Sequence, residues 1–385
     1  MKLAIPKERL EHEKRVAATP ETVKKLSGLG LQVVVETGAG QASAIADSAF
    51  EEAGATIAPD AAETFKDADI VFKVQRPLPE EISLIKRGAI LVAMLSPYKD
   101  KDLEGVKAYA EAGINAFTME FMPRIARAQS MDVLSSQSNL AGYKAVIDAA
   151  AVFNRAIPMM ITAAGTIVPA RVMVMGAGVA GLQAIATARR LGAIVCATDV
   201  RPAAQEEVES LGASFVMVES EETKDAETAG GYAKEMSEDY KKRQEKLVAE
   251  TIKSQDIVIC TALIPGRPAP LLITEEMVKS MKAGSVIVDL AVEQGGNCAP
   301  SKPDEVVEAH GVTILGHLNV PGRLSRDASA LYAKNLLNFI TPLIETETNT
   351  LKIDWEDEII KGTALTKDGA LIHPVLVKEL DKGGN

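Results

Sequence analysis

One segment constrains the fold of this chain more than any other. The apolar run RVMVM (residues 171–175) leads directly into GAGVAG (residues 176–181), which is followed by a sequence typical of a helix. A strand, a glycine-rich turn and a helix in this order predict the start of a doubly wound α/β domain. We expect Gly176 to allow the tight turn, Gly178 to let a pyrophosphate approach the backbone, and Gly181 to let the helix pack closely on the strand.

The next strand-like run, AIVCATD, ends in Asp199, at the spacing expected for a dinucleotide site. A carboxylate there can accept both ribose hydroxyls of an adenosine and repels a 2′-phosphate, which favours NAD(H) over NADP(H). Val200 and Arg201 follow, and we expect Arg201 to flank the adenine or the diphosphate, although an arginine can also hold a 2′-phosphate. Val179 and Ala180 begin the helix, whose free N–H groups favour the phosphates. A purely structural glycine turn is the alternative.

Strand-like runs alternate with helical stretches in two successive blocks of the sequence. This alternation predicts an α/β protein with two Rossmann-like, doubly wound parallel-sheet domains and a cleft between them. We expect residues 135–315 to form the nucleotide-binding domain. Residues 1–134 and 316–385 are expected to form the other domain, because the C-terminal tail is too short to fold alone.

Composition excludes several classes of protein. The 385 residues carry a net charge of −11, so no basic stripe is available to bind nucleic acid. The N-terminus lacks the apolar core of a signal peptide, and no run of about eighteen apolar residues predicts a membrane span. The three cysteines, Cys196, Cys260 and Cys298, show no metal-binding spacing and are expected to be inert thiols.

Two further segments are candidates for the rim of the nucleotide site. Leu263 follows the strand-like run DIVICTA, and we expect it to pack on the adenosine or the nicotinamide. The strongly charged stretch from residue 219 to 250 contains Gly231 and Tyr232, with Gln244 on its return arm. It is either a mobile flap that closes over the nucleotide or a solvated helical excursion.

A dehydrogenase acting on an amino or hydroxy acid needs a proton acceptor beside the hydride donor. The histidines are His12, His310, His317 and His373. We expect His310 to end a helix, where the helix dipole favours a cation. Only His317, after the strand-like run VTIL, is expected near the cleft.

Several motifs resemble those of known enzymes. RVAATP, KVQRP, VMGAGVAGLQAIATARRLGA and VDLAVEQGGN resemble the corresponding segments of alanine dehydrogenases. MPRIARAQSMDVLSSQSNLAGYKAVIDAA, DAETAGGYAKEMS and TALIPGRPAP are similar to the NAD(H)-binding component of proton-translocating nicotinamide nucleotide transhydrogenases. This second resemblance extends over nearly the whole chain.

The transhydrogenase resemblance assigns roles to the segment RIARAQSMDVLSS. It implies that Gln129 bridges toward NADP(H) on a partner, since its amide can donate and accept at once. Asp132 and Ser135 would fix the carboxamide and the ribose, while Arg124 and Arg127 hold the loop and nearby phosphate or carboxamide groups. The expected catalytic residues are Arg124, Gln129, Asp132 and Ser135. The expected cofactor contacts in this segment are Arg124, Ile125, Ala126, Arg127, Gln129, Ser130, Met131 and Asp132.

A structural interpretation of the same segment is open. Ser135 and Ser136 precede an apolar helix, so they are candidates for its N-cap. An N-cap explains the serines but leaves Gln129 and the two arginines unexplained.

The comparison with alanine dehydrogenases also shows differences. Arg15 and Lys73 match that family's substrate-contacting arginine and lysine. The family's histidine is missing, since the chain reads Met-Leu-Ser-Pro at residues 94–97, and Glu293 replaces an aspartate. Loss of the histidine puts amino-acid oxidation in doubt. Direct hydride transfer between two nicotinamides needs alignment of the rings rather than a base.

The resemblance therefore implies an NAD(H)-binding subunit, without a metal, that passes hydride from NADH to NADP+ on a separate component. In the complete complex this step would be coupled to proton translocation. We expect a homodimer that associates with NADP(H)-binding and transmembrane components, as a peripheral protein on the cytoplasmic face of the inner membrane. The alternatives are an alanine dehydrogenase-like oxidoreductase and a non-enzymatic NAD(H)-sensing module.

Overall fold

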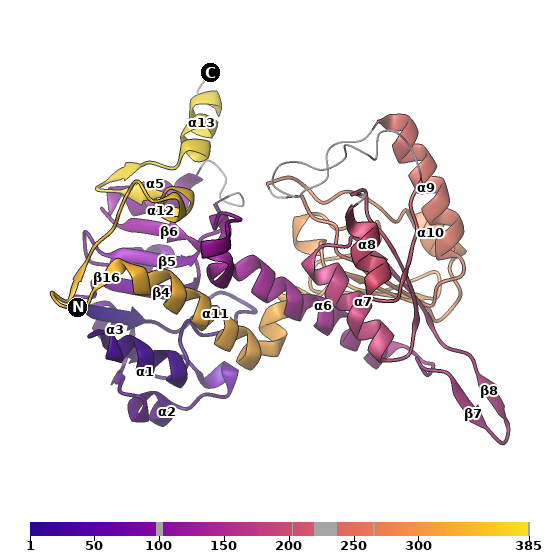
Figure 1. Cartoon of the computed structure of the whole chain (residues 1–385), viewed down its shortest axis with the longest axis horizontal. Coiled ribbons are helices and arrows are strands. Elements are labelled where there is room, and N and C mark those ends of the chain that lie inside the picture. Colours follow the sequence, from indigo (N-terminus) through magenta and orange to yellow (C-terminus); the bar gives the residue numbers. More distant parts are fainter. Residues whose placement is uncertain (98–102, 202, 219–236, 265, 384–385) are drawn as a thin grey trace. The chain divides into compact units, whose positions relative to one another are not determined.

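The computed structural model describes residues 1–97, 103–201, 203–218, 237–264 and 266–383. The chain divides into two compact units (Figure 1). Unit 1 comprises Met1–Gln137 and Gly322–Asn385, and unit 2 comprises Ser138–Pro321. Each unit contains a predominantly parallel β-sheet, so the predicted α/β class with doubly wound sheets is confirmed.

Unit 1 is built on a six-stranded parallel sheet with the order β3-β2-β1-β4-β5-β6. Its strands are β1 (Lys2–Ile5), β2 (Gln32–Glu36), β3 (Thr56–Ala58), β4 (Ile70–Gln75), β5 (Ile90–Met94) and β6 (Asn115–Thr118). Its helices are α1 (Pro20–Gly28), α2 (Asp47–Glu52), α3 (Ala61–Phe65), α4 (Pro79–Ile82), α5 (Glu104–Glu111), α11 (Ser325–Ile340), α12 (Glu358–Thr363) and α13 (Pro374–Gly383). Short elements are η1 (Gln41–Ser43), η4 (Met119–Phe121), η5 (Ala126–Met131), η9 (Thr341–Leu343), β16 (Ile344–Glu345), β17 (Thr350–Leu351), β18 (Thr366–Lys367) and β19 (Ala370–Leu371).

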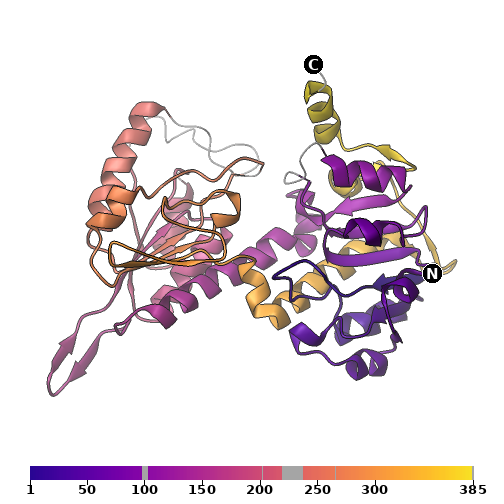
Figure 2. The ribbon, with the colours of Figure 1, turned by 180° about the vertical axis from the view of Figure 1, so that it is seen from behind.

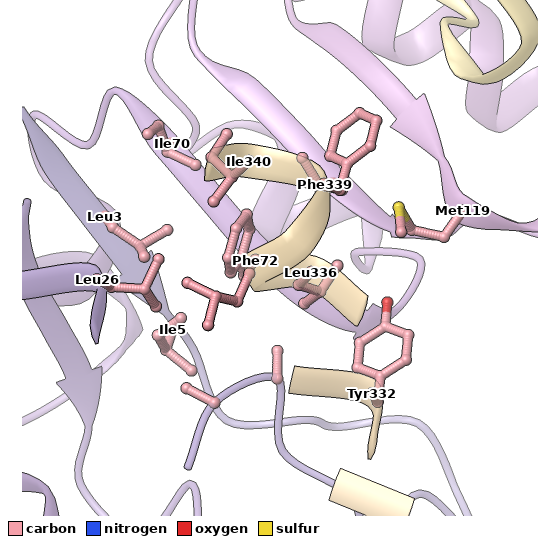
Figure 3. Close-up of a cluster of buried hydrophobic side chains, with 14 of the residues drawn as sticks. Leu3, Ile5, Leu26, Ile70, Phe72, Met119, Tyr332, Leu336, Phe339 and Ile340 are labelled. Atoms are coloured by element: carbon pink, nitrogen blue, oxygen red, sulfur yellow. The ribbon is translucent and has the colours of Figure 1, made fainter. Parts of the chain in front are cut away.

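The C-terminal helix α11 belongs to the core of unit 1. Figure 3 shows Leu336, Phe339 and Ile340 of this helix pointing toward Leu3 of β1 and Phe72 of β4. Helices α1 and α2 pack on the same face, and α3 and α5 cover the other face of the sheet. Burial of both faces explains why the central strands are almost entirely apolar.

Unit 2 contains a seven-stranded sheet with the order β11-β10-β9-β12-β13-β15-β14. Its strands are β9 (Arg171–Met175), β10 (Ile194–Thr198), β11 (Ser214–Phe215), β12 (Ile257–Cys260), β13 (Val286–Asp289), β14 (Val306–Ala309) and β15 (Val312–Leu315). Its helices are α7 (Val179–Arg190), α8 (Ala203–Ser210), α9 (Glu238–Ile252) and α10 (Glu275–Ser280), with η7 (Val292–Gln294). The boundary between the units falls within α6 (Val133–Val152), and a second boundary falls within η8 (Val320–Leu324).

Helices cover both faces of the sheet in unit 2. Helices α6, α7 and α8 pack on one face, and α9 and α10 pack on the other (Figures 1 and 2). The strand order reverses between β9 and β12, which lie next to each other near the centre of the sheet. In folds of this kind, ligands bind beyond the carboxyl ends of the strands at such a point.

One histidine lies in a different element from the predicted one. His310 does not end a helix, because Val306–Ala309 forms strand β14, which pairs antiparallel with β15. His310 and Gly311 occupy the turn between these strands with φ values of 54° and 79°. Two positive φ values suit the right-handed twist of a hairpin, and this local geometry displaced the expected helix.

A second hairpin in unit 2 has no counterpart among the sequence predictions. Strands β7 (Met160–Thr162) and β8 (Gly165–Ile167) pair antiparallel and are exposed along their whole length. Figure 1 shows this hairpin extending away from the sheet of unit 2. Among the residues that the structure describes, no helix has the length and apolar character needed to cross a membrane.

Candidate functional site

The glycine turn of unit 2 has the predicted geometry. Gly176 has a φ of 102°, which favours glycine. A Cβ built on Gly181 would lie 1.8 Å from the carbonyl oxygen of Gly176, so only glycine allows α7 to pack this closely. At Gly178, the N-cap of α7, a Cβ would meet no described atom within 4 Å. The backbone at Gly178 is therefore open to a ligand, next to the free N–H groups of Val179 and Ala180.

Asp199 lies at the carboxyl end of β10 and is already held by protein groups. Its Oδ2 atom accepts a hydrogen bond of 2.8 Å from the backbone N–H of Ala177. Its Oδ1 atom accepts bonds from the backbone N–H of Arg201 at 2.9 Å and from Nε of Arg201 at 3.0 Å. The structure therefore brings Asp199, Val200 and Arg201 to the glycine turn, with the guanidinium of Arg201 paired to the carboxylate.

The loops that follow β12 and β13 support this turn through residues that the sequence did not single out. The hydroxyl of Thr261 donates to the carbonyl oxygen of Gly176 at 2.8 Å. The fully buried amide of Asn297 donates to the carbonyl oxygen of Ala262 at 2.9 Å and accepts from the N–H of Ala262 at 3.1 Å. The sequence signal for this support is the pair of glycines that precedes Asn297.

The buried carboxylate of Asp289 fixes the second of these loops. It accepts hydrogen bonds from the backbone N–H groups of Ala291 at 2.9 Å, Asn297 at 2.9 Å and Cys298 at 3.1 Å. Burial raises the pKa of Asp289, although the backbone donors partly oppose this. A Cβ on Gly296 would lie 2.8 Å from Oδ2 of Asp289, which explains the glycine at that position.

The remaining rim residues of unit 2 are only partly described. Leu263 follows β12 and is 39% exposed. Gln244 on α9 donates from Nε2 to Oγ1 of Thr198 at 2.8 Å, and its Oε1 accepts from the N–H of Val218 at 3.1 Å. Gly231 and Tyr232 lie outside the described residues.

The polar segment that precedes α6 lies in unit 1. Ala128, Met131 and Val133 are buried in the same apolar cluster as α11, whereas Arg124 and Gln129 are exposed. Ile125 is half-buried against the cluster, while Ala126 and Ser130 are exposed. The segment therefore has one face in the core and one polar face directed to solvent.

The N-terminus of α6 differs from the serine cap considered from the sequence. The helix begins at Val133, so Ser135 and Ser136 lie in its first turn. Asp132 provides the cap, since its carboxylate accepts the N–H of Ser135 at 3.0 Å and the hydroxyl of Ser135 at 2.5 Å. The exposed guanidinium of Arg127 pairs with Asp357, the N-cap of α12, at 2.6 Å.

A buried ionic cluster occupies the carboxyl edge of the sheet in unit 1. Arg15 is 3% exposed and forms two side-chain hydrogen bonds with Glu13, of 2.8 and 2.7 Å. Lys73 is 1% exposed and lies 3.2 Å from Glu81 and 3.5 Å from Glu8. The two residues that match the substrate contacts of alanine dehydrogenases are therefore paired with carboxylates of the chain itself.

Burial affects the protonation of this cluster. It raises the pKa of Glu8 to about 7, against the opposing effect of Lys73. Burial also opposes ionisation of Glu13, but the hydrogen bonds from Arg15 outweigh it and lower the pKa of Glu13. A pocket of about 270 Å³ opens beside the cluster, lined by Lys7, Glu8, Glu13, Lys14, Arg15, Gly38, Ala39, Gln41 and Ala42.

The position of the missing histidine is occupied by a hydrogen-bonded serine turn. Ser96 follows β5 with a φ of 49°, and its hydroxyl donates to Glu120 at 3.2 Å. The other candidate base, His317, follows β15 in unit 2 and is half-buried. Glu293 lies in the same unit and accepts from the N–H of Asn319 at 2.8 Å.

Neither a metal site nor a reactive thiol is apparent in the described ranges. No group of three or more potential His, Cys, Asp or Glu ligands is found among the residues that the structure describes. Burial raises the pKa of Cys196 to about 11 and that of Cys298 to about 12, and it raises the pKa of Cys260 well above its usual range. All three thiols are free and protonated at neutral pH, as expected for inert cysteines.

Comparisons with known proteins agree with this organisation. Residues 4–141 match the alanine dehydrogenase/PNT N-terminal domain, and residues 145–374 match the alanine dehydrogenase/PNT C-terminal domain. An NAD(P) transhydrogenase subunit alpha protein of Rhodospirillum rubrum is 59% identical over 381 residues, covering 98% of this chain and 99% of that protein. The crystal structure of transhydrogenase from Sinorhizobium meliloti has a TM-score of 0.88 and 54% identity, covering 97% of this chain and 100% of that one.

Alanine dehydrogenases are more distant. That of Halomonas elongata is 31% identical over 358 residues, which cover 90% of this chain and 88% of that protein. The similarity to the two transhydrogenase proteins is higher in both identity and coverage. The chain therefore belongs to the alanine dehydrogenase/PNT family, in the branch of the NAD(P) transhydrogenase alpha subunits.

Proposed function

We propose that this chain is the NAD(H)-binding subunit of a proton-translocating NAD(P) transhydrogenase. In this function NADH supplies a hydride from C4 of its nicotinamide directly to C4 of NADP+, which gives NAD+ and NADPH. The NADP(H) is held by a separate partner component. In the complete complex the reaction is coupled to proton translocation by transmembrane components.

The open backbone at Gly178 is the observation that carries cofactor binding. A pyrophosphate needs close approach to the turn, and no described side chain occupies that space. Asp199 stands at the adjoining strand end, where a ribose would lie. The turn is held rigidly by Thr261 and, through the neighbouring loop, by Asn297, so the site is preorganised.

The surroundings of Ser96 favour hydride exchange over amino-acid oxidation. Oxidation of an amino acid releases protons and needs a base near the reacting carbon. The hydroxyl of Ser96 is bound to Glu120 and does not replace the histidine of the alanine dehydrogenases. A substrate carboxylate would also have to compete with Glu13 for Arg15, within a hydrogen-bonded ion pair.

The polar segment of unit 1 would handle the nicotinamide end of the cofactor. Gln129 is exposed and can donate and accept, so it suits a bridge to groups on the partner's NADP(H). Asp132 and Ser135 would orient the carboxamide and the ribose, while Arg124 and Arg127 stabilise the segment and neighbouring groups. These residues act by orientation and exclusion of water rather than by proton transfer.

We also propose a homodimer, and the β7–β8 hairpin supports it. Ile161 is 78% exposed, and Met159 and Val168 are 60% and 61% exposed on its flanks. An apolar hairpin that extends away from its own unit is typical of a surface that pairs with a second copy. Attachment to the cytoplasmic face of the inner membrane would occur through the transmembrane partner components.

The proposal is tested by mixing the purified chain with NADH and a purified NADP(H)-binding component loaded with an NADP+ analogue. We expect rapid NADH-dependent reduction of the analogue. Absence of that transfer, with NADH bound normally, would favour a sensing role. Consumption of NADH with pyruvate and ammonia, by the chain alone, would instead establish the alanine dehydrogenase-like activity.

A further inference from the structure

We propose that Asn335 and Asn338 of α11 are positioning residues for hydride transfer. They hold the carbonyl oxygen of Ser130, and thereby fix the neighbouring Gln129 in one orientation. This inference rests on the proposed function, because Gln129 is assigned to the bridge between the two nucleotides. It adds two residues far along the chain that act through the backbone of the segment rather than by contact with a nucleotide.

The contacts converge on a single backbone atom. Nδ2 of Asn335 donates to the carbonyl oxygen of Ser130 at 2.9 Å, and Nδ2 of Asn338 donates to the same oxygen at 3.0 Å. Residues three apart on a helix lie on the same face, so both amides reach this atom without distortion. A carbonyl oxygen has two lone pairs, and both are used here.

The carbonyl needs these partners because of its place in the segment. Ser130 lies in the last turn of η5, where the backbone carbonyl groups have no N–H donors within the helix. The amide of Asn335 also accepts from the hydroxyl of Ser136 at 2.9 Å, in the first turn of α6. Asn335 therefore links the end of η5 to the start of α6, the two elements that flank Asp132.

Packing and a second ion pair complete the support. Ala128 and Met131 are 0% and 7% exposed, and they anchor the inner face of the segment against the cluster that contains Leu336. Arg127 is held by Asp357 on the other side of Gln129. An exposed glutamine on an otherwise irregular segment is thus supported on both sides, as a group requires when its orientation sets a rate.

Neutral amides suit this role. A lysine or an arginine could also donate to the carbonyl, but it would add charge close to Gln129. Asparagine supplies the donor on a short side chain with little freedom. The chemistry of the two residues therefore points to geometry rather than to electrostatic stabilisation.

The test uses the full-length chain with substitutions Asn335→Asp, Asn338→Asp and the pair together. Each removes the donor to Ser130 with almost no change of shape. Asn115→Asp is the matched control, since Nδ2 of Asn115 donates to the carbonyl oxygen of Gly88 at 3.2 Å, at the far end of β6 from the segment. Asn338→Gln retains an amide and should restore part of the rate.

We expect the double variant to slow hydride transfer to the partner's NADP+ analogue by about 10-fold or more, since small misplacements are costly. Its dissociation constant for NADH should stay within about twofold of the wild-type value, because Gly178 and Asp199 are unchanged. Asn115→Asp should resemble the wild type in both measurements. Equal transfer rates in the double variant and the control, or a slower rate explained entirely by weaker NADH binding, would overturn the inference.

Limited trypsin digestion provides a readout that does not depend on activity. Cleavage after Arg124 and Arg127 should be several-fold faster in the double variant than in the wild type or in Asn115→Asp. Unchanged cleavage would show that the amides do not fix the segment. If the wild-type chain transfers no hydride, the proposed function fails, and the digestion still decides whether Asn335 and Asn338 hold the segment.

Discussion

Arg201 and Asp199 form a forked ion pair, with Nε of Arg201 3.0 Å from Oδ1 of Asp199 and Nη2 3.1 Å from Oδ2. The carboxylate that would accept the ribose hydroxyls thus also neutralises a nearby cation suited to a 2′-phosphate. We expect this pair to set the preference for NADH over NADPH. Asp199→Asn should leave the guanidinium free and reduce the preference for NADH by about 10-fold or more, as a gained charged contact implies.

The check is isothermal titration of NADH and NADPH into the wild type, Asp199→Asn and Asp199→Asn/Arg201→Gln. The double variant should lose the gained affinity for NADPH, because no guanidinium remains at residue 201 to hold the phosphate. If Asp199→Asn binds NADPH no better than the wild type does, the pair has no part in specificity.

Gln129 is exposed at the polar face of its segment, where a bridging amide is required. We expect Gln129→Asn to slow hydride transfer to the partner by about 10-fold or more, because the shortened side chain fails to reach both groups. The NADH dissociation constant should change by less than about twofold. Stopped-flow measurement of transfer, beside equilibrium NADH titration, separates the two effects. A large loss of NADH affinity would instead assign Gln129 to binding alone.

Gly178 and Gly181 should respond differently to the same substitution. Gly181→Ala places a Cβ 1.8 Å from a backbone oxygen and should lower the stability of unit 2 by about 1–3 kcal/mol. Gly178→Ala meets no described atom and has an ordinary φ of −76°, so its melting temperature should be unchanged while NADH affinity falls.

Gly28→Ala is the control for both glycine variants, since a Cβ there also meets no described atom within 4 Å and the residue lies in unit 1. It should change neither melting nor NADH affinity. Thermal melting and NADH titration of the three proteins provide the check. Normal NADH binding by a folded Gly178→Ala protein would contradict the proposed path of the pyrophosphate.

Glu8 should make the stability of the chain depend on pH. Its pKa is raised from 4.5 to about 7 by burial, so the folded protein keeps a proton that the unfolded chain releases at lower pH. The free energy of unfolding should therefore fall as pH rises from about 4.5 to 7, by at most about 3 kcal/mol from this residue.

Glu8→Gln removes that decline, because the glutamine stays neutral. Relative to the wild type, the variant should become more stable at pH 8 than it is at pH 5, as measured by urea denaturation midpoints. Glu11→Gln, at a side chain that is 89% exposed, is the control and should leave the pH profile unchanged. A Glu8→Gln profile parallel to that of the wild type would show that Glu8 does not titrate in this range.

The β7–β8 hairpin should determine the oligomeric state. Ile161→Lys places a charge on its most exposed apolar position and should convert a dimer into monomers, as sedimentation velocity would show. Leu271→Lys adds the same charge at a position that is 60% exposed elsewhere in unit 2, and it should leave the dimer intact. A wild-type monomer, or a dimer unaffected by Ile161→Lys, would rule out this interface.

Local features of the sequence were sufficient to predict the α/β class and the glycine turn. The roles of Gly176 and Gly181 depend on chain conformation and close approach within a few residues, so they are readable from spacing alone. The resemblance to the transhydrogenase branch is likewise confirmed, because long contiguous motifs identify a family without knowledge of contacts. His310 was misassigned because a hairpin turn and a helix end both favour a polar residue followed by glycine.

Only the tertiary structure showed which side chains those local features depend on. Asn335 and Asn338 lie about two hundred residues from Ser130, and Thr261 lies 85 residues from Gly176. The structure also showed that Asp199 is shared with Arg201 and that Arg15 and Lys73 are held by Glu13, Glu8 and Glu81. Sequence periodicity records which residues are apolar, and glycine spacing records where the backbone turns. Hydrogen bonds and ion pairs between distant segments depend on three-dimensional proximity, which is established only when the sheets and helices pack.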